Sequence, residues 1–310
     1  MDMKGSDWMN EVTEKAKFRP WIERHLNDQE ESIRLQKEYD IPEEFLTYSM
    51  DKDESARIDY DEDTNTLLII FDAPFRDEQK TSIYSSGPMS FIIKSSVIVT
   101  SFSNEHMRNA FSDRFRNSLD PQLKTRFVLL WLLEITSQYL NDLRVLNKMR
   151  VKIEQSLGTT PKNKDLMELM RIERSLIFFI MSLKSNFIVI SKIQSGRYLT
   201  LYEEDDEILD DLTVEIEQGI DMATISNRIL NEMTDSYSAI ISNSMNSVMK
   251  FLTIYSLILT IPTIIFSFYG MNVPLPFDDN GELSWVIITV LAFLLSGIAA
   301  YMFNRIDRFK

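Results

Sequence analysis

The feature that most constrains this chain is an apolar stretch near its C-terminus, from Phe251 to Phe268. The stretch holds 18 residues and no charged side chain, and about this length of helix is needed to cross a bilayer. A second apolar stretch runs from Ser284 to Phe303, where Gly297, Ala299 and Ala300 are small enough for close helix contact. The sequence therefore predicts a hairpin of two transmembrane helices.

Polar side chains recur along the first stretch and just before it, at alternating steps of four and three residues. This is the 3.5-residue period of a heptad, which keeps one helix face turned toward like partners. Intramembrane polar groups face a bundle interior or a water-filled cavity, so we interpret this seam as the wall of a pore. Hydroxyl groups that only join helices are the alternative. The seam consists of Ser242, Asn246, Met249, Thr253, Ser256, Thr260, Thr263 and Ser267, of which Met249 alone is apolar.

The stretch ends in Tyr269-Gly270-Met271-Asn272, and Pro262 lies within it. Upstream stands the run Asn246-x-Val248-Met249-Lys250-x-Leu252-Thr253. Together these motifs resemble those of the CorA magnesium channels. The close match covers roughly Asp235 to the C-terminus, whereas the first 200 residues resemble the family only in their order of elements. The resemblance implies a funnel-shaped homopentamer.

The expected fold class is an α+β cytoplasmic domain followed by long helices and the two-helix transmembrane hairpin. In the N-terminal part we predict a helix over Glu23–Glu38, a buried strand at Thr66–Phe71, and a hairpin of Ser90–Lys94 with Val97–Thr100, preceded by a turn at Gly87-Pro88. The expected divisions are an α/β domain (1–120), a helical hairpin (121–200), a stalk helix (201–250), a pore helix (251–272), an extracellular loop (273–283), a second membrane helix (284–303) and a basic tail (304–310).

Long helices are predicted from Asp120-Pro121 onward. The first covers Phe127–Lys152 and the second about Lys164–Ile193. Within the second, Lys184, Ser185 and Asn186 interrupt an apolar run, which favours a buried helix of a soluble bundle over a membrane span. The third starts near Leu201 and meets no proline before Pro262, so we expect it to continue to Phe268.

Composition excludes several classes of protein. The chain has no cysteine, which excludes disulfides and thiolate metal sites. Its formal net charge is −14 and no basic stripe is present, which argues against a nucleic-acid partner. No phosphate loop or catalytic triad spacing occurs, so an enzyme is not expected. His25 and His106 stand alone, and Trp131 is interpreted as a packing residue.

Charge is unevenly distributed. The third helix begins with a run of acids between Glu203 and Asp221, which indicates either a solvated face or weak sites for hard divalent cations. The family resemblance places Asp211 at a regulatory Mg²⁺ site between subunits, with an unidentified partner carboxylate. The loop carries Asp278, Asp279 and Glu282 and no base, whereas bases follow the second span. The positive-inside rule then predicts a cell (inner or plasma) membrane protein with both termini in the cytoplasm.

Taken with the pore seam, the resemblance to the CorA magnesium channels implies passive Mg²⁺ influx, with Co²⁺ and Ni²⁺ as further substrates, driven by the membrane potential and gated by intracellular Mg²⁺. The expected partners are copies of the chain itself, membrane lipid and divalent cations. The alternatives are a zinc or broader divalent-cation transporter of the same superfamily, or a non-conducting tethered scaffold or sensor. The expected filter consists of Gly270, Met271 and Asn272, and Asn272 contacts the hydration shell of the ion. Met249 and Leu252 are expected to form a hydrophobic gate, and the rest of the seam to line the pore. Asp235 is expected either at the inner mouth or as a solvated stalk residue.

Overall fold

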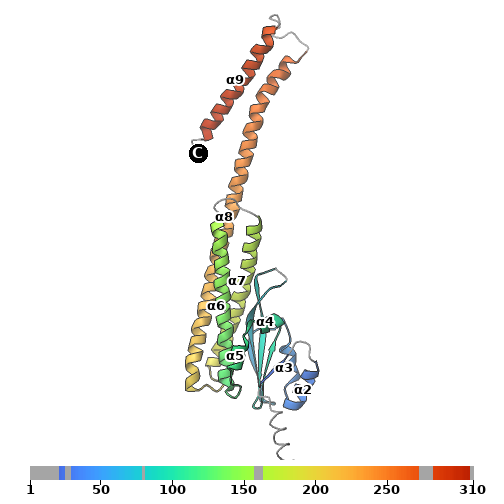
Figure 1. Cartoon of the computed structure of the whole chain (residues 1–310), viewed down its shortest axis with the longest axis vertical. Helices are drawn as coiled ribbons and strands as arrows, with labels where there is room; N and C mark the ends of the chain where they lie inside the picture. The colour runs from blue at the N-terminus through green and yellow to red at the C-terminus, as the bar shows by residue number, and fades with distance from the viewer. Residues whose placement is uncertain (1–20, 25–28, 79–80, 157–162, 272–281, 308–310) are drawn as a thin grey trace, which may run out of the picture. The chain divides into compact units, whose positions relative to one another are not determined.

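The computed structural model describes residues 21–24, 29–78, 81–156, 163–271 and 282–307 (Figure 1). Residue contacts divide the chain into two compact units, residues 1–234 and 235–310. Helix α8 (Glu203–Tyr269) is continuous over 67 residues and contributes to both units. This confirms the prediction that one unbroken helix leads from near Leu201 into the apolar stretch.

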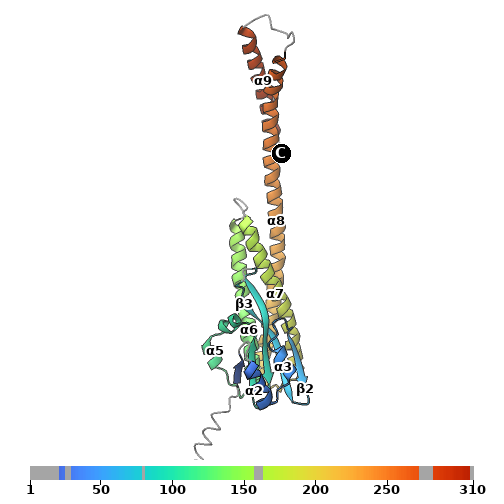
Figure 2. The ribbon, with the colours of Figure 1, turned by 90° about the vertical axis from the view of Figure 1, so that its right-hand side faces the viewer.

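Unit 1 contains a sheet of five strands in the order β1-β5-β4-β3-β2. Strands β2 to β5 form an antiparallel meander, and β1 pairs in parallel with β5 (Figure 2). The antiparallel pairing of β4 with β5 confirms the predicted hairpin, and β3 confirms the predicted buried strand. The bounds are β1 Trp21–Arg24, β2 Arg57–Asp61, β3 Thr66–Arg76, β4 Tyr84–Ile93 and β5 Ile98–Phe102.

Both faces of the sheet are covered by helices. Leu67, Ile69 and Phe71 of β3 enter the larger core with the long helices, whereas Leu68 and Ile70 enter a smaller core with α2 and α3 (Figure 1). The alternation follows from the two-residue side-chain period of a strand. It explains why β3 reads as a continuous apolar run in the sequence. The shorter helices are α2 (Gln29–Tyr39), α3 (Glu43–Tyr48), α4 (Glu105–Ala110) and α5 (Asp113–Asn117).

Two expectations for the N-terminal part need correction. The helix predicted over Glu23–Glu38 is confirmed from Gln29, where α2 begins, but Glu23 lies in β1, where its carboxylate pairs with Arg108 and Arg116. Gly87 and Pro88, expected in a turn, lie within β4. A Cβ atom at Gly87 would lie 2.9 Å from the hydroxyl oxygen of Ser103, so this glycine permits a close approach instead of a turn.

The long helices of unit 1 are α6 (Lys124–Ser156), α7 (Asn163–Gln194) and the first part of α8. By length and composition alone, α7 would be able to cross a membrane. It packs instead against the sheet, where the Asn186 amide donates to the carbonyl of Asp72 and accepts from its N–H, both at 2.8 Å. Its Leu183 approaches Gly219 of α8 so closely that an added Cβ would lie 3.3 Å away. These contacts confirm that α7 is a helix of the bundle.

Trp131 of α6 is fully buried, which confirms its packing role. Its ring lies edge-on to Phe115 at 5.0 Å and to Phe111 at 5.1 Å between centroids. Such edge-to-face pairs add to the free energy gained from area burial alone. The cluster therefore joins α6 to the segment that follows β5.

Two carboxyl groups are buried between the sheet and the helices. Burial raises the pKa of Asp72 and of Asp142 from 3.8 to about 6, and hydrogen bonds from Ser182 and Gln138, respectively, offset part of that effect. Asp142 is 6 % exposed and Tyr84 also hydrogen-bonds to it. Each group therefore prefers to be protonated in the folded protein at a pH where it is ionised in the unfolded chain.

The raised pKa of Asp142 predicts a pH dependence of stability. Its contribution to the free energy of unfolding is greatest below pH 3.8 and is lost as the pH rises through about 6. As the pH rises from about 5 to about 8, we expect the free energy of unfolding of Asp142→Asn to increase by about 1.4 kcal/mol relative to that of wild type. Urea titrations of the detergent-solubilised protein, followed by tryptophan fluorescence, measure this. The exposed-acid control Asp206→Asn should show no such gain, and equal behaviour of both variants would refute the assignment.

Candidate functional site: the polar face of helix α8

Unit 2 consists of the second part of α8 and of α9 (Glu282–Asp307). Both helices are long and apolar enough to cross a membrane, the second over Trp285–Phe303. In α9 the most buried side chains are Ala292 and Ser296, which are 0 % and 7 % exposed. Gly297, expected at a helix contact, is exposed, and a Cβ added to it would meet none of the described residues within 4 Å. The buried positions of α9 therefore lie on a face that does not include this glycine.

One face of the apolar part of α8 is partly covered. Five half-buried residues follow one another at steps of about half a heptad, and Pro262 is half-buried beside them; the five are Ile254, Ile258, Ile261, Ile265 and Tyr269. Because α9 is the other helix described in unit 2, and because Phe303 of α9 lines a pocket with Ile254 and Ile258, this is the face toward α9.

The polar seam lies on the other side of α8. All eight members, from Ser242 to Ser267, are exposed. At 3.6 residues per turn, their mean direction is about 150° around the helix axis from the face toward α9. Helix α9 therefore covers the apolar side of α8 and leaves the polar side open.

The hydroxyl groups of the seam threonines donate hydrogen bonds to backbone carbonyl groups of the same helix. Thr253 donates to the carbonyl of Met249, Thr260 to that of Ser256 and Thr263 to that of Leu259, each at 2.8 Å. A hydroxyl has one hydrogen and two lone pairs. The seam therefore presents oxygen atoms that can accept hydrogen bonds. The water molecules around a hydrated cation point their hydrogen atoms outward and need such acceptors.

At the C-terminal end of α8 only part of the predicted filter is described. Helix α8 ends at Tyr269, and the N–H of Gly270 bonds the carbonyl of Phe266 at 3.0 Å. Gly270 does not have a positive φ, but a Cβ added to it would lie 3.3 Å from the carbonyl oxygen of Phe266, which is a tight contact. Met271 is 53 % exposed. Asn272, Asp278 and Asp279 and the side chain of Glu282 lie outside the described residues.

Toward the N-terminal end of the seam, the residues predicted as gate and mouth are exposed. Met249 is 56 % and Leu252 is 54 % exposed, with Met249 on the seam and Leu252 beside it. Asp235 is exposed at the start of unit 2, seven residues before Ser242. A single chain thus leaves every described member of the predicted path uncovered.

The acids at the start of α8 fall into two groups. Asp205 accepts from the N–H of Tyr202 at 3.2 Å, Glu204 pairs with Arg126 at 3.1 Å, and Glu215 accepts from Ser137 at 2.9 Å. Asp205 therefore caps the first turn of α8, whereas Glu204 and Glu215 join α8 to α6. The sequence alone does not separate them from the rest of the run.

Asp211 belongs to the second group. It is exposed, and among the described residues its carboxylate has no hydrogen-bond or ion-pair partner. It shares a helix face with Asp221 and with Val214 and Ile225, which are 64 % and 59 % exposed. Within the described part of one chain, no three His, Asp or Glu side chains gather as a metal site. A face of mixed acidic and apolar residues is suited to contact with another surface.

Comparison with known proteins covers most of the chain. The family model of the CorA-like Mg²⁺ transporter proteins matches residues 19–305. The Cobalt/magnesium transport protein CorA of Methanocaldococcus jannaschii is 27 % identical over 291 residues, which cover 92 % of this chain and 90 % of that protein.

Solved structures show the same fold. The complete structure of the CorA magnesium transporter from Methanocaldococcus jannaschii matches with a TM-score of 0.77 at 26 % identity, over 92 % of this chain and 90 % of that one. The full-length CmaX protein matches with a TM-score of 0.64 at 14 % identity, over 93 % and 87 %. The second likeness concerns the fold alone. The chain therefore belongs to the CorA-like Mg²⁺ transporter protein family, a family of membrane transport proteins and not of enzymes.

Proposed function

We propose that this chain forms a homopentameric channel through which Mg²⁺ enters the cell passively, and that intracellular Mg²⁺ closes it. The observation that carries the proposal is the polar seam of α8, which is exposed and faces away from α9. Its oxygen atoms are uncovered in a helix that is otherwise apolar enough for a membrane. Exposure of such a face to lipid is unfavourable.

Several copies of the chain remove this conflict. Two membrane helices cannot enclose a path, but α8 helices arranged around an axis turn their seams toward each other and leave α9 outside. The family resemblance implies five copies. Unit 1 also exposes large apolar side chains that a neighbour can cover, such as Met167 at 68 % and Met181 at 64 % on α7.

The ion chemistry follows from the lining. Mg²⁺ dehydrates reluctantly and keeps several waters in octahedral geometry. The threonine oxygens of the seam accept hydrogen bonds from those waters, so the hydrated ion moves without losing its shell. We assign the outer filter to Gly270, Met271 and a ring of Asn272 carboxamides, and the attraction of cations to Asp278, Asp279 and Glu282. The name of the archaeal relative also includes cobalt, so we propose Co²⁺, and by similar chemistry Ni²⁺, as further substrates.

The driving force is the membrane potential. A divalent cation that enters a cell at about −100 mV gains about 4.6 kcal/mol, twice the value for one charge. Bases follow α9 whereas none lie in residues 273–283, so we orient both termini toward the cytoplasm. In this orientation Asp235 lies at the inner mouth. Above it Met249 and Leu252 form a hydrophobic gate that closes by dewetting.

Regulation is assigned to the exposed acids of α8. In a ring of subunits their charges repel one another, and Mg²⁺ bound at Asp211 between neighbours offsets that repulsion. The ion stabilises the closed assembly only because it binds that assembly better than the open one. Carboxylate sites that retain water are weak enough to respond to free Mg²⁺ in a cell.

The seam assignment is tested by flux into proteoliposomes. Thr260→Leu should reduce Mg²⁺ uptake at fixed potential by about tenfold or more, because a barrier increase of about 1.4 kcal/mol suffices for tenfold. Ile261→Leu is the matched control on the face toward α9 and should conduct normally. If the two variants take up Mg²⁺ at equal rates, the seam does not line the path.

The outer filter is tested with Asn272→Ala. We expect this variant to assemble normally but to lose Mg²⁺ uptake by about tenfold or more, because the carboxamide acceptors of the hydrated ion are gone. Uptake of Mg²⁺, Co²⁺, Ni²⁺ and Zn²⁺ is compared at the same potential. Wild-type rates for all four ions in the variant would exclude Asn272 from selection, and a wild-type preference for Zn²⁺ would favour a zinc transporter.

The regulatory site is tested by protease protection. Asp211→Lys places a fixed positive charge where Mg²⁺ would bind, so this variant should resist protease without Mg²⁺. Wild type should gain at least about fivefold protection when Mg²⁺ is added, as expected for about 1 kcal/mol of coupling. Asp211→Ala should show less of that gain. If Mg²⁺ alters neither proteolysis nor flux of wild type, regulation by Mg²⁺ is wrong while the path remains possible.

A further inference from the structure

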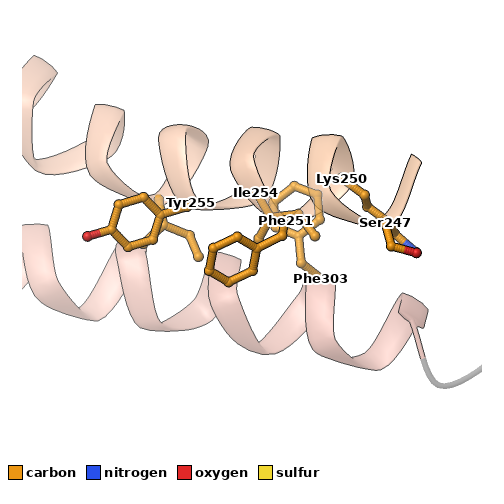
Figure 3. A pocket seen from close by; sticks show the side chains of 7 residues that line it. Ser247, Lys250, Phe251, Ile254, Tyr255 and Phe303 are labelled. Atoms are coloured by element: carbon orange, nitrogen blue, oxygen red, sulfur yellow. The ribbon is translucent and has the colours of Figure 1, made fainter. Parts of the chain in front are cut away.

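A pocket of about 430 Å³ lies between α8 and α9 of unit 2 (Figure 3). Figure 3 shows the ring of Phe303 reaching from α9 toward the α8 residues. The volume of the pocket lies within the range of about 300–1,000 Å³ that is typical of sites for one small ligand. The lining residues are Ser247, Lys250, Phe251, Ile254, Tyr255, Ile258 and Phe303.

The pocket is polar at one end and apolar along the rest. Ser247 and Lys250 stand at the polar end, directly before the uncharged stretch that starts at Phe251 (Figure 3). A lysine at the end of a membrane helix extends its ammonium to the level of the lipid head groups. The pocket therefore begins at that level and continues beside apolar and aromatic side chains into the hydrocarbon layer. A pocket with one cation at its polar end and apolar walls beyond it matches a lipid with an anionic head group and an acyl chain.

The position of the pocket on α8 decides between occupants. Its α8 residues point, on average, about 160° around the helix axis from the polar seam. If the seams meet around a pore, which is the proposed function on which this inference rests, the pocket opens away from the pore and toward lipid. Phe251 and Tyr255 are 70 % and 54 % exposed, so its outer side is open.

The polar residues of the pocket favour a lipid whose head group contains a phosphate and also a free hydroxyl group. The hydroxyl of Ser247 donates to the carbonyl of Asn243 at 3.0 Å, so its oxygen remains as an acceptor for a head-group hydroxyl. Lys250 supplies the charge for the phosphate, worth about 1 kcal/mol for one base at an anionic surface. A zwitterionic lipid offers the phosphate together with an opposing cation, which Lys250 repels.

We propose that this pocket binds one anionic phospholipid of the cytoplasmic leaflet, with its phosphate on Lys250 and an acyl chain along Phe251, Ile254 and Phe303. The bound lipid fills the space between the two membrane helices within one helical turn of Met249, in the proposed gate.

The test is native mass spectrometry of the full-length oligomer, delipidated and then given phosphatidylglycerol or phosphatidylcholine. Wild type should retain phosphatidylglycerol preferentially. Lys250→Gln should weaken that retention about fivefold, the effect of about 1 kcal/mol. The control Arg305→Gln removes an exposed base at the end of α9 that does not line the pocket, and it should leave retention unchanged. Equal losses in both variants, or equal retention of both lipids by wild type, would overturn the proposal.

Two further arms separate the other occupants. Excess inorganic phosphate should not displace phosphatidylglycerol; displacement would make the site one for small anions. A photoreactive phenylalanine analogue at position 303 should form an adduct with lipid in proteoliposomes. A cross-link to a second copy of the chain would show that the pocket is a subunit contact. Adducts are counted independently of ion flux, so a preparation that binds the lipid but conducts nothing would contradict the proposed channel and not the lipid site.

Discussion

The proposed channel depends on one constraint: in an apolar helix that crosses a bilayer, a continuous row of polar side chains is more stable facing water or another helix than facing hydrocarbon. In α8 the polar and apolar side chains are separated, since the polar seam and the face toward α9 lie on opposite sides of the helix. The half-buried part of α8 on the side of α9 is mostly apolar, and Ala292 and Ser296 are the most buried of the described side chains of α9. Under the proposed function, the remaining face is turned toward water and other copies of the same helix. The proposed pore and the proposed assembly then have the same physical cause.

Unit 1 supplies a rigid base for its own part of α8. Gly219 brings α8 into close contact with Leu183 of α7, and Asn186 of α7 bonds both backbone groups of Asp72 in β3. The acids of α8 divide between this structural role and exposure. Glu204 and Glu215 bind α6, whereas Asp211 faces solvent and remains available to a neighbour.

The helices and the membrane hairpin were predictable because their signals are local: a 67-residue run with one proline, a heptad of polar residues and a terminal Gly-Met-Asn. The failures share a different cause. Gly87-Pro88 has the composition of a turn, but the space beside Ser103 in the assembled sheet decides its role. The burial of Asp72 and Asp142, the separation of structural from exposed acids, and the pocket with Phe303 all depend on contacts between distant segments, which a linear pattern does not contain.

The central claim is that the seam faces water inside the membrane, and the chain lends itself to a direct measurement because it has no cysteine. Single cysteines at Ser256, Thr260, Ile258 and Ile261 can be reacted with a membrane-impermeant thiol reagent in proteoliposomes at low Mg²⁺. Only a hydrated cysteine ionises to the reactive thiolate. The account predicts rapid labelling at positions 256 and 260 and protection at 258 and 261. Equal labelling at all four positions, or labelling confined to 258 and 261, would contradict it.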